Sequence, residues 1–243
     1  NLFGSILSIF TKTPIMWSIH HASPFNNSLK TKLIVLLNTL VSYFSPTRIV
    51  YCSNYAYKTH SPIGFKKKIQ SVICNGIDTD YFTCDNNLGN KEKIQIGFVG
   101  RWDPIKNHKL FIKVVSDLLK KDNNLEIMMA GQRINDKNED LLESLNDNAV
   151  KEKIKLLDEC DDIVSFFCNL DILVSCSFEE SFGLVIAEAM ACRTLCVVTN
   201  TGMSSTIVGN TGIIVPINDR ESLHNGILKL IRLDERKRLE LHS

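Results

Sequence analysis

The stretch of sequence that decides the fold is residues 177–191, Ser-Phe-Glu-Glu-Ser-Phe-Gly-Leu-Val-Ile-Ala-Glu-Ala-Met-Ala. It follows an apolar run at residues 171–176 with the composition of a buried parallel strand, and from Leu184 onward its apolar residues repeat at helical spacing. In an open parallel sheet, ligands bind beyond the carboxyl ends of the strands, where a following helix presents unsatisfied N–H groups and a positive dipole end. The stretch therefore predicts a strand, a loop and a helix, with an anion site at the helix N-terminus.

Gly183 lies at the expected start of this helix. Because it has no side chain, a phosphate could approach the backbone of Phe182, Gly183 and Leu184 closely. Two carboxylates flank that position, Glu180 before the helix and Glu188 roughly 12 Å further along its axis. Ionised carboxylates accept hydrogen bonds from paired hydroxyls, so this arrangement suits a diphosphate between two sugars. The alternative is that Glu180 is an ordinary helix N-terminal acid and that Glu188 faces solvent.

The composition is that of a folded globular protein with room for one or two domains, with 243 residues, 44% of them hydrophobic, and a net charge of +1. The eight cysteines are scattered, and none forms a Cys-x2-Cys pair. We expect them to be reduced core residues of a cytoplasmic protein, with a zinc site or a disulfide framework as the alternative. No apolar run approaches the roughly 20 residues that a membrane-spanning helix needs.

The amino-terminal part of the chain is basic, since residues 1–90 contain eight Lys or Arg and three Asp or Glu. This excess favours peripheral contact with the anionic inner face of a membrane, or with a phosphorylated lipid acceptor, and we expect no nucleic-acid partner. For the run Lys66-Lys67-Lys68, however, a solvated turn is the preferred interpretation.

Strands alternate with helical patterns along most of the chain, which predicts parallel α/β sheets. The expected strands are residues 14–19, 47–51, 69–73, 94–99, 125–130, 153–157, 172–176, 194–198 and 211–215. Residues 75–78 are a turn signal that follows the third of these strands. The three strands before this turn are too few for a doubly wound fold, so the amino-terminal half of their domain is expected to be missing.

A second motif follows the expected strand at residues 94–99 and reads Gly-Arg-Trp-Asp-Pro-Ile-Lys-Asn-His at residues 100–108. Gly100 allows the backbone to turn tightly after the strand. Arg101 and Lys106 extend from the loop at the carboxyl end of the strand. Two fixed cations there would stabilise the charge that grows on a departing diphosphate, as a metal ion does in other enzymes. The alternative is a surface pair near a helix start.

These motifs resemble the retaining glycosyltransferases of the group 1 (family 4) type, which have the GT-B fold. Glu180 and Glu188 match the Glu-x7-Glu signature of that family, and Gly100-Arg101 followed by Lys106 matches its cationic motif. In that family a turn similar to residues 75–78 marks the crossing into the second domain. The resemblance therefore implies two Rossmann-like doubly wound domains, residues 1–77 on the acceptor side and incomplete, and residues 78–243 binding the nucleotide-sugar donor. It further implies that Glu180 contacts the donor sugar and Glu188 the ribose, with no metal and no cofactor.

Further residues are expected at the same site. The family commonly has a histidine after a strand of the amino-terminal domain, and His21 is the choice for that position, with His20 as the runner-up. The loop containing Gly131 lies at the same predicted sheet edge and should border the nucleotide base. Thr201 and Gly202, after the strand at residues 194–198, are expected to complete the sugar pocket.

The function implied is transfer of a hexose-type sugar from a nucleotide-diphosphate sugar to an alcohol acceptor, a glycan or a lipid-linked sugar, with retention. Biosynthesis of a cell-surface polysaccharide or glycolipid is the expected setting. The alternative is a non-catalytic nucleotide-sugar-binding fragment or degenerate paralogue. It is supported by the incomplete first domain and by Arg193 and Thr206, where the family commonly has Gly and Glu.

Overall fold

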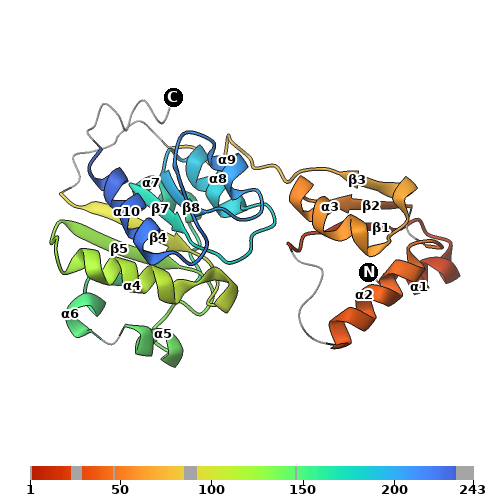
Figure 1. The fold of residues 1–243 in the computed structure, drawn as a ribbon, viewed down its shortest axis with the longest axis horizontal. Helices are drawn as coiled ribbons and strands as arrows, with labels where there is room; N and C mark the ends of the chain where they lie inside the picture. Colours follow the sequence, from red (N-terminus) through yellow and green to blue (C-terminus); the bar gives the residue numbers. More distant parts are fainter. Residues whose placement is uncertain (1, 23–28, 46, 85–91, 146, 234–243) are drawn as a thin grey trace. The chain divides into compact units, whose positions relative to one another are not determined.

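The computed structural model describes residues 2–22, 29–45, 47–84, 92–145 and 147–233. The chain divides into two compact units, the first made of Asn1–Gly76 with Glu179–Gly183 and the second of Ile77–Phe178 with Leu184–Ser243. Each unit is built on its own parallel sheet with helices, so the chain has the α/β class that the sequence predicts (Figure 1).

The first unit contains a three-stranded parallel sheet in the order β1-β2-β3. The strands are β1 (Met16–Ile19), β2 (Arg48–Tyr51) and β3 (Gln70–Val72), and the helices are α1 (Leu2–Thr11), α2 (Leu29–Val41) and α3 (Asn54–His60), with 3₁₀ turns at Ser61–Ile63 and Lys67–Ile69. The three strands confirm the prediction, whereas α1 has no counterpart among the predicted elements.

The core of the first unit forms on one face of this sheet because side chains alternate along the strands. Trp17 and Ile19 of β1 are buried, as are Ile49 and Tyr51 of β2. The indole N–H of Trp17 donates to Ser5 Oγ at 2.9 Å, which fastens α1 to the sheet.

No helix in the described part of the chain is long and apolar enough to cross a membrane.

The second unit contains a six-stranded parallel sheet in the order β6-β5-β4-β7-β8-β9. The strands are β4 (Ile94–Val99), β5 (Leu125–Ala130), β6 (Ile154–Leu156), β7 (Ile172–Ser175), β8 (Leu195–Thr199) and β9 (Ile213–Val215). Numbered within this unit, the order is 3-2-1-4-5-6, which is that of a Rossmann fold. The connections reverse direction between β4 and β7, which are direct neighbours.

Helices cover both faces of the second sheet. They are α4 (His108–Leu119), α5 (Glu139–Ser144), α6 (Asn148–Lys151), α7 (Ile163–Asn169), α8 (Leu184–Ala191), α9 (Ser204–Val208) and α10 (Arg220–Ile231), with a 3₁₀ turn at Pro104–Lys106. Buried residues of α4 and α10 belong to one hydrophobic cluster, and those of α7 and α8 to another. Because both faces are covered, β8 is buried along its whole length and reads as a continuous apolar run.

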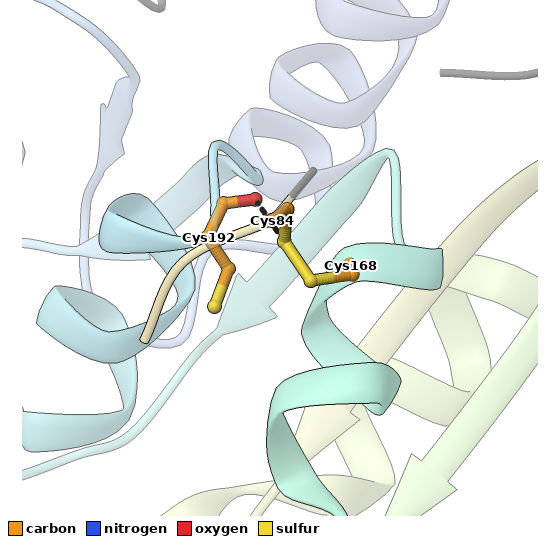
Figure 2. A group of neighbouring side chains, drawn as sticks. All are labelled: Cys84, Cys168 and Cys192. Atoms are coloured by element: carbon orange, nitrogen blue, oxygen red, sulfur yellow. Dashed lines mark hydrogen bonds between the residues drawn. A yellow bond between two sulfur atoms is a disulfide. The ribbon is translucent and has the colours of Figure 1, made fainter. Parts of the chain in front are cut away.

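One prediction about the cysteines is wrong. Cys84 and Cys168 form a disulfide, although all eight cysteines were expected to be reduced (Figure 2). The partners are 84 residues apart in sequence, and the fold brings α7 to the segment that precedes β4. The remaining six cysteines are free, and Cys176, Cys192 and Cys196 among them are buried core residues as expected. Spacing along the chain carries no signal for so distant a pair.

The end of α8 is closed by a Schellman motif. Arg193 N–H donates to Met190 O and Thr194 N–H donates to Ala189 O, each at 2.9 Å, and Arg193 has a left-handed φ of 60°. A side chain at this position costs about 1 kcal/mol relative to glycine.

We therefore expect Arg193→Gly to unfold with a free energy about 1 kcal/mol higher than Arg193→Ala. The alanine variant is the matched control, because it also removes the arginine side chain but keeps the Cβ. Urea denaturation of both variants measures the difference. Equal midpoints would show that the backbone at this position is not strained.

Candidate functional site

The candidate site lies at the carboxyl ends of β4 and β7, where the strand order of the second unit reverses. In open α/β sheets this switch point is where ligands bind. The segment that follows β7 is held to the loop that follows β4, because Phe178 N–H donates to Ile105 O at 2.8 Å. Cys176 Sγ makes a weaker contact to Asn107 O at 3.4 Å. The fold therefore joins the two loops that carry the motifs found in the sequence.

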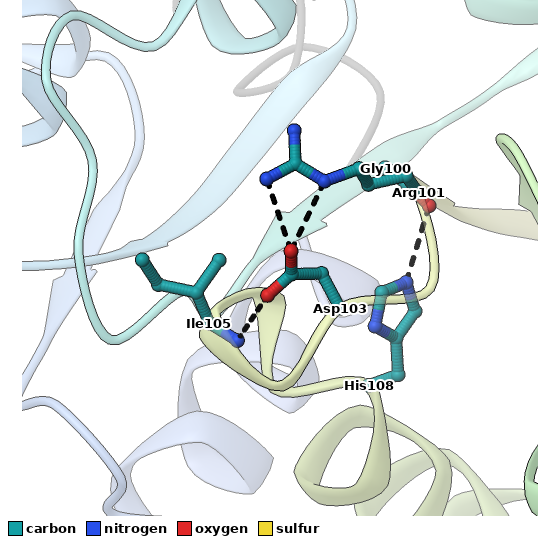
Figure 3. A network of polar contacts seen from close by, with 5 residues as sticks. All are labelled: Gly100, Arg101, Asp103, Ile105 and His108. Atoms are coloured by element: carbon teal, nitrogen blue, oxygen red, sulfur yellow. Dashed lines mark hydrogen bonds and ion pairs between the residues drawn. The ribbon is translucent and has the colours of Figure 1, made fainter. Parts of the chain in front are cut away.

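Arg101 and Asp103 form the polar centre of the loop after β4 (Figure 3). The guanidinium of Arg101 donates through Nε and Nη2 to Asp103 Oδ2, at 3.1 and 3.0 Å. Asp103 Oδ1 accepts from Ile105 N–H at 3.0 Å, and this bond is the largest cause that lowers the pKa of Asp103, with Arg101 contributing. Asp103 is thus ionised and holds the Arg101 head group in one direction.

Sequence reasoning missed Asp103. The signal was present, since an acidic residue two positions from a candidate cation can turn back toward it, but the pattern alone does not show that it does. The Asp103 side chain also caps the 3₁₀ turn Pro104–Lys106, which is how the loop brings Lys106 back toward its start.

Lys106 lies over the beginning of the same loop. A Cβ built on Gly100 would lie 3.5 Å from Lys106 Cγ, so the stem of the lysine covers the glycine. Lys106 is half-buried. The structure therefore brings together Lys106 and Gly100 on the loop that also carries Arg101. The sequence predicts the two cations for the diphosphate and Gly100 for the turn at the donor site.

A second residue that the sequence analysis missed is His108, the first residue of α4. It is buried against the rings of Phe98 and Trp102, with centroids 4.5 and 4.8 Å away. Its Nε2–H donates to Gly100 O at 3.2 Å. Burial is the main cause that lowers the pKa of His108 to about 4, so the ring is neutral at pH 7. A neutral, buried ring of this kind fixes the carbonyl at the end of β4.

The loop after β5 contacts the loop after β4 through backbone atoms. Gly100 N–H donates to Ala130 O and Trp102 N–H donates to Gln132 O, each at 2.9 Å. Gly131 has a φ of +137°, and a Cβ there would lie 2.4 Å from Gly100 O. Only glycine fits, because a side chain would collide with fixed backbone in a conformation that L-residues rarely adopt. Gly131 thus adjoins Gly100.

The loop after β8 lies beside the segment that follows β7. Thr199 Oγ1 donates to Ser177 O at 2.8 Å, and Thr201 Oγ1 donates to Phe178 O at 3.4 Å. Thr201 is buried, and Gly202 follows it with a φ of 56°. Thr201 and Gly202 therefore border the switch point from the side of β8.

Glu188 lies on α8, which begins at Leu184 directly after Gly183 with its φ of 102°. Glu188 is half-buried, and burial is the cause that raises the pKa of its carboxyl. In the described part of the chain its carboxylate makes no hydrogen bond that would offset this cost. A half-buried carboxylate that lacks such a hydrogen bond is a good acceptor for the hydroxyl groups of a ligand.

The other predicted residues belong to the first unit. Glu180 and Phe182 are half-buried and fall in the segment Glu179–Gly183 that groups with this unit. His21 is exposed and follows β1, at the carboxyl end of its strand. The runner-up, His20, has its Nε2 2.7 Å from Ser18 Oγ.

A Rossmann-ordered sheet whose switch point is lined by glycines and cations defines the class of doubly wound α/β domains, in which ligands bind at that point. Comparison with known families agrees. The chain belongs to the family described as glycosyl transferases group 1, whose model matches residues 84–241.

Three curated relatives illustrate the similarity. The capsular polysaccharide biosynthesis glycosyltransferase CapM of Staphylococcus aureus is 32% identical over 249 residues, covering 95% of this chain and 64% of that protein. An uncharacterised 41.2 kDa protein in the cps region of Klebsiella pneumoniae is 29% identical over 184 residues, covering 70% of this chain and 48% of that protein. A D-inositol 3-phosphate glycosyltransferase of Paenarthrobacter aurescens is 33% identical over 130 residues, or 51% and 32% of the two chains. The chain thus spans between 32% and 64% of the length of these relatives.

Solved structures show the fold. Anabaena Alr3699/HepE in complex with UDP and glucose superposes with a TM-score of 0.85 at 20% identity, covering 100% of this chain and 68% of that one. A sucrose-phosphate synthase from Thermosynechococcus elongatus gives a TM-score of 0.79 at 17% identity, covering 100% and 65%. The chain therefore has the GT-B fold, as the sequence predicts.

Proposed function

We propose that this chain binds a nucleotide-diphosphate sugar and takes part in transferring the sugar to an alcohol acceptor, a glycan or a lipid-linked sugar, with retention and without a metal. The observation that carries the proposal is that one loop at the switch point of the second sheet holds two cations, Arg101 bonded to Asp103 and Lys106 with its stem over Gly100. The capsular relative supports a surface polysaccharide as the product.

The two cations fit the leaving group. When the bond between the sugar and the diphosphate breaks, negative charge grows on the bridging oxygen, and preorganised cations stabilise that charge without having to reorient. Asp103 supplies the preorganisation for Arg101, while packing over Gly100 supplies it for Lys106.

Glu188 fits the nucleoside end of the donor. An ionised carboxylate in a half-buried position is destabilised by desolvation, which is what its raised pKa reports. Hydrogen bonds from ribose hydroxyls would favour the ionised form and offset this cost. We assign Glu180 to the hydroxyls of the donor sugar, and His21 to the same sugar from the first unit. Glu180 then serves as a positioning group.

The test of this function is calorimetric titration with UDP, GDP and their common sugar conjugates in the presence of EDTA. We expect binding that favours one base, and a loss of about 10- to 100-fold in affinity for Arg101→Ala and for Lys106→Ala, because each removes a charge-assisted contact to phosphate. Lys109→Ala is the matched control. Lys109 lies three residues beyond Lys106, but its Nζ pairs with Asp140 Oδ1 at 2.7 Å.

The outcomes separate the candidates. If no nucleotide binds, or if Lys109→Ala weakens binding as much as Lys106→Ala, the donor site is not where we place it. Nucleotide binding together with no transfer in a protein that contains the acceptor side would favour the non-catalytic alternative.

A further inference from the structure

Three cysteine sulfurs meet in the second unit, away from the candidate donor site. The Sγ atoms of Cys84, Cys168 and Cys192 all lie within 4.8 Å of one another, and among the described residues no other set of His, Cys, Asp or Glu side chains comes together in this way (Figure 2). Cys168 lies just before β7, and Cys192 lies just before β8. The cluster is therefore at the amino ends of these strands, whereas the switch point is at their carboxyl ends.

Three separate segments supply the sulfurs. Cys84 comes from the segment before β4, Cys168 from α7 and Cys192 from the turn that closes α8. Cys84 Sγ lies 3.2 Å from the backbone oxygen of Cys192, so Cys192 is next to the disulfide (Figure 2). Cys192 is buried, and the other two are half-buried. The disulfide uses only two of these residues, and the packing of the core places the third sulfur beside them.

We propose that Cys84, Cys168 and Cys192 form a thiolate site for Zn²⁺ in the reduced protein. A Zn–S bond of about 2.3 Å places the sulfurs of a tetrahedral site roughly 3.8 Å apart. Cys192 Sγ already lies within 4.8 Å of the other two sulfurs, and Cys84 and Cys168 reach that spacing once their disulfide is reduced and the two sulfurs separate. Thiolate ligands select Zn²⁺ and related thiophilic cations over oxygen-preferring ones such as Mg²⁺. Three cysteines leave a fourth position, which a water molecule can occupy.

The disulfide and the metal are alternative states of the same residues. A dithiol reductant donates two electrons and two protons to the Cys84–Cys168 bond and itself becomes a disulfide. Binding of Zn²⁺ then displaces one proton from each of the three thiols, and while the ion is bound the disulfide cannot re-form. In both states Cys84 stays linked to Cys168 on α7, through the disulfide or through the metal ion. The segment around Cys84 is therefore anchored to α7 in both states.

The experiment uses the whole chain, reduced and then freed of reductant, and titrated with Cd²⁺ as a spectroscopic probe. We expect a sulfur-to-cadmium charge-transfer band that saturates at one ion per chain and that Zn²⁺ displaces. Cys192→Ser should weaken binding by about 100-fold or more, since it removes a direct ligand. Cys74→Ser is the matched control, because Cys74 is exposed and free.

Cys192→Ser is the decisive variant, because it retains the cysteines of the disulfide. If this variant binds Cd²⁺ as tightly as the unchanged chain, or if the disulfide form does, the proposal is wrong. Native thiol counting is the second measurement and does not depend on the variant. Zn²⁺ should protect three thiols from a thiol reagent in the reduced chain, and protection of none would overturn the site.

Discussion

Gly131→Ala is expected to destabilise the second unit by about 3 kcal/mol or more, which urea denaturation measures. Two costs add. The residue would have to hold a φ of +137°, and its Cβ would lie 2.4 Å from Gly100 O, an atom fixed by the backbone. Neither the strand ends nor the neighbouring turn can move away easily, because Gly100 N–H and Trp102 N–H are both bonded to the loop of Gly131.

Two glycines provide controls for this effect. A Cβ on Gly76 would meet nothing within 4 Å, so Gly76→Ala should leave stability nearly unchanged. A Cβ on Gly100 would meet Lys106 Cγ at 3.5 Å, which is ordinary contact, so Gly100→Ala should also fold normally. A Gly131→Ala variant as stable as Gly76→Ala would show that the two loops can separate at little cost.

Glu180→Gln is expected to lower sugar transfer by about 100- to 1,000-fold while nucleotide affinity changes little. The amide keeps the size of the side chain but removes its charge, so it can no longer accept strong hydrogen bonds from the sugar hydroxyls as the donor reaches the transition state. Release of nucleoside diphosphate measures transfer, and calorimetry measures binding. Both are carried out on a protein that contains the acceptor side.

Glu179→Gln is the control for this second effect, since Glu179 is the neighbouring acid and is also half-buried. We expect it to leave transfer largely intact. Equal loss of transfer and of nucleotide affinity in Glu180→Gln would mean that Glu180 holds the nucleotide rather than the sugar. No loss of either would remove Glu180 from the site.

Much of the fold was accessible from local patterns. The strands β4 and β5 have the bounds that the sequence predicts, because a strand covered on both faces reads as a continuous apolar run. The sequence also predicts the start of α8 at Leu184, because apolar residues recur at helical spacing from there on. By contrast, α1 has no counterpart among the predicted elements: its large apolar residues Phe3, Ile9 and Phe10 are exposed, so apolar side chains do not mark its inner face.

The candidate site was accessible only in part. Glu188 stands out because a carboxylate in an apolar helix is costly to bury, whereas Arg101 and Lys106 stand out by their place after a strand and by their match to the family motif. Asp103 and His108 were not predicted, because the role of each depends on one particular hydrogen bond. Asp103 accepts from the Arg101 guanidinium, and His108 donates to the Gly100 carbonyl. Residue types and their spacing show which polar side chains the loops carry, but not which of these side chains form hydrogen bonds with one another in the fold.

By itself, the sequence determined the α/β class, the alternation of strands and helices, and the loops that carry the charged and glycine residues, because propensity and hydrophobic periodicity act over a few neighbouring residues. Only the tertiary structure decided that β4 lies beside β7, that Gly131 adjoins Gly100, and that Cys84, Cys168 and Cys192 meet. These contacts join residues far apart in the chain. They follow from the order in which strands pair and from the packing of both sheet faces, and no local pattern records that order.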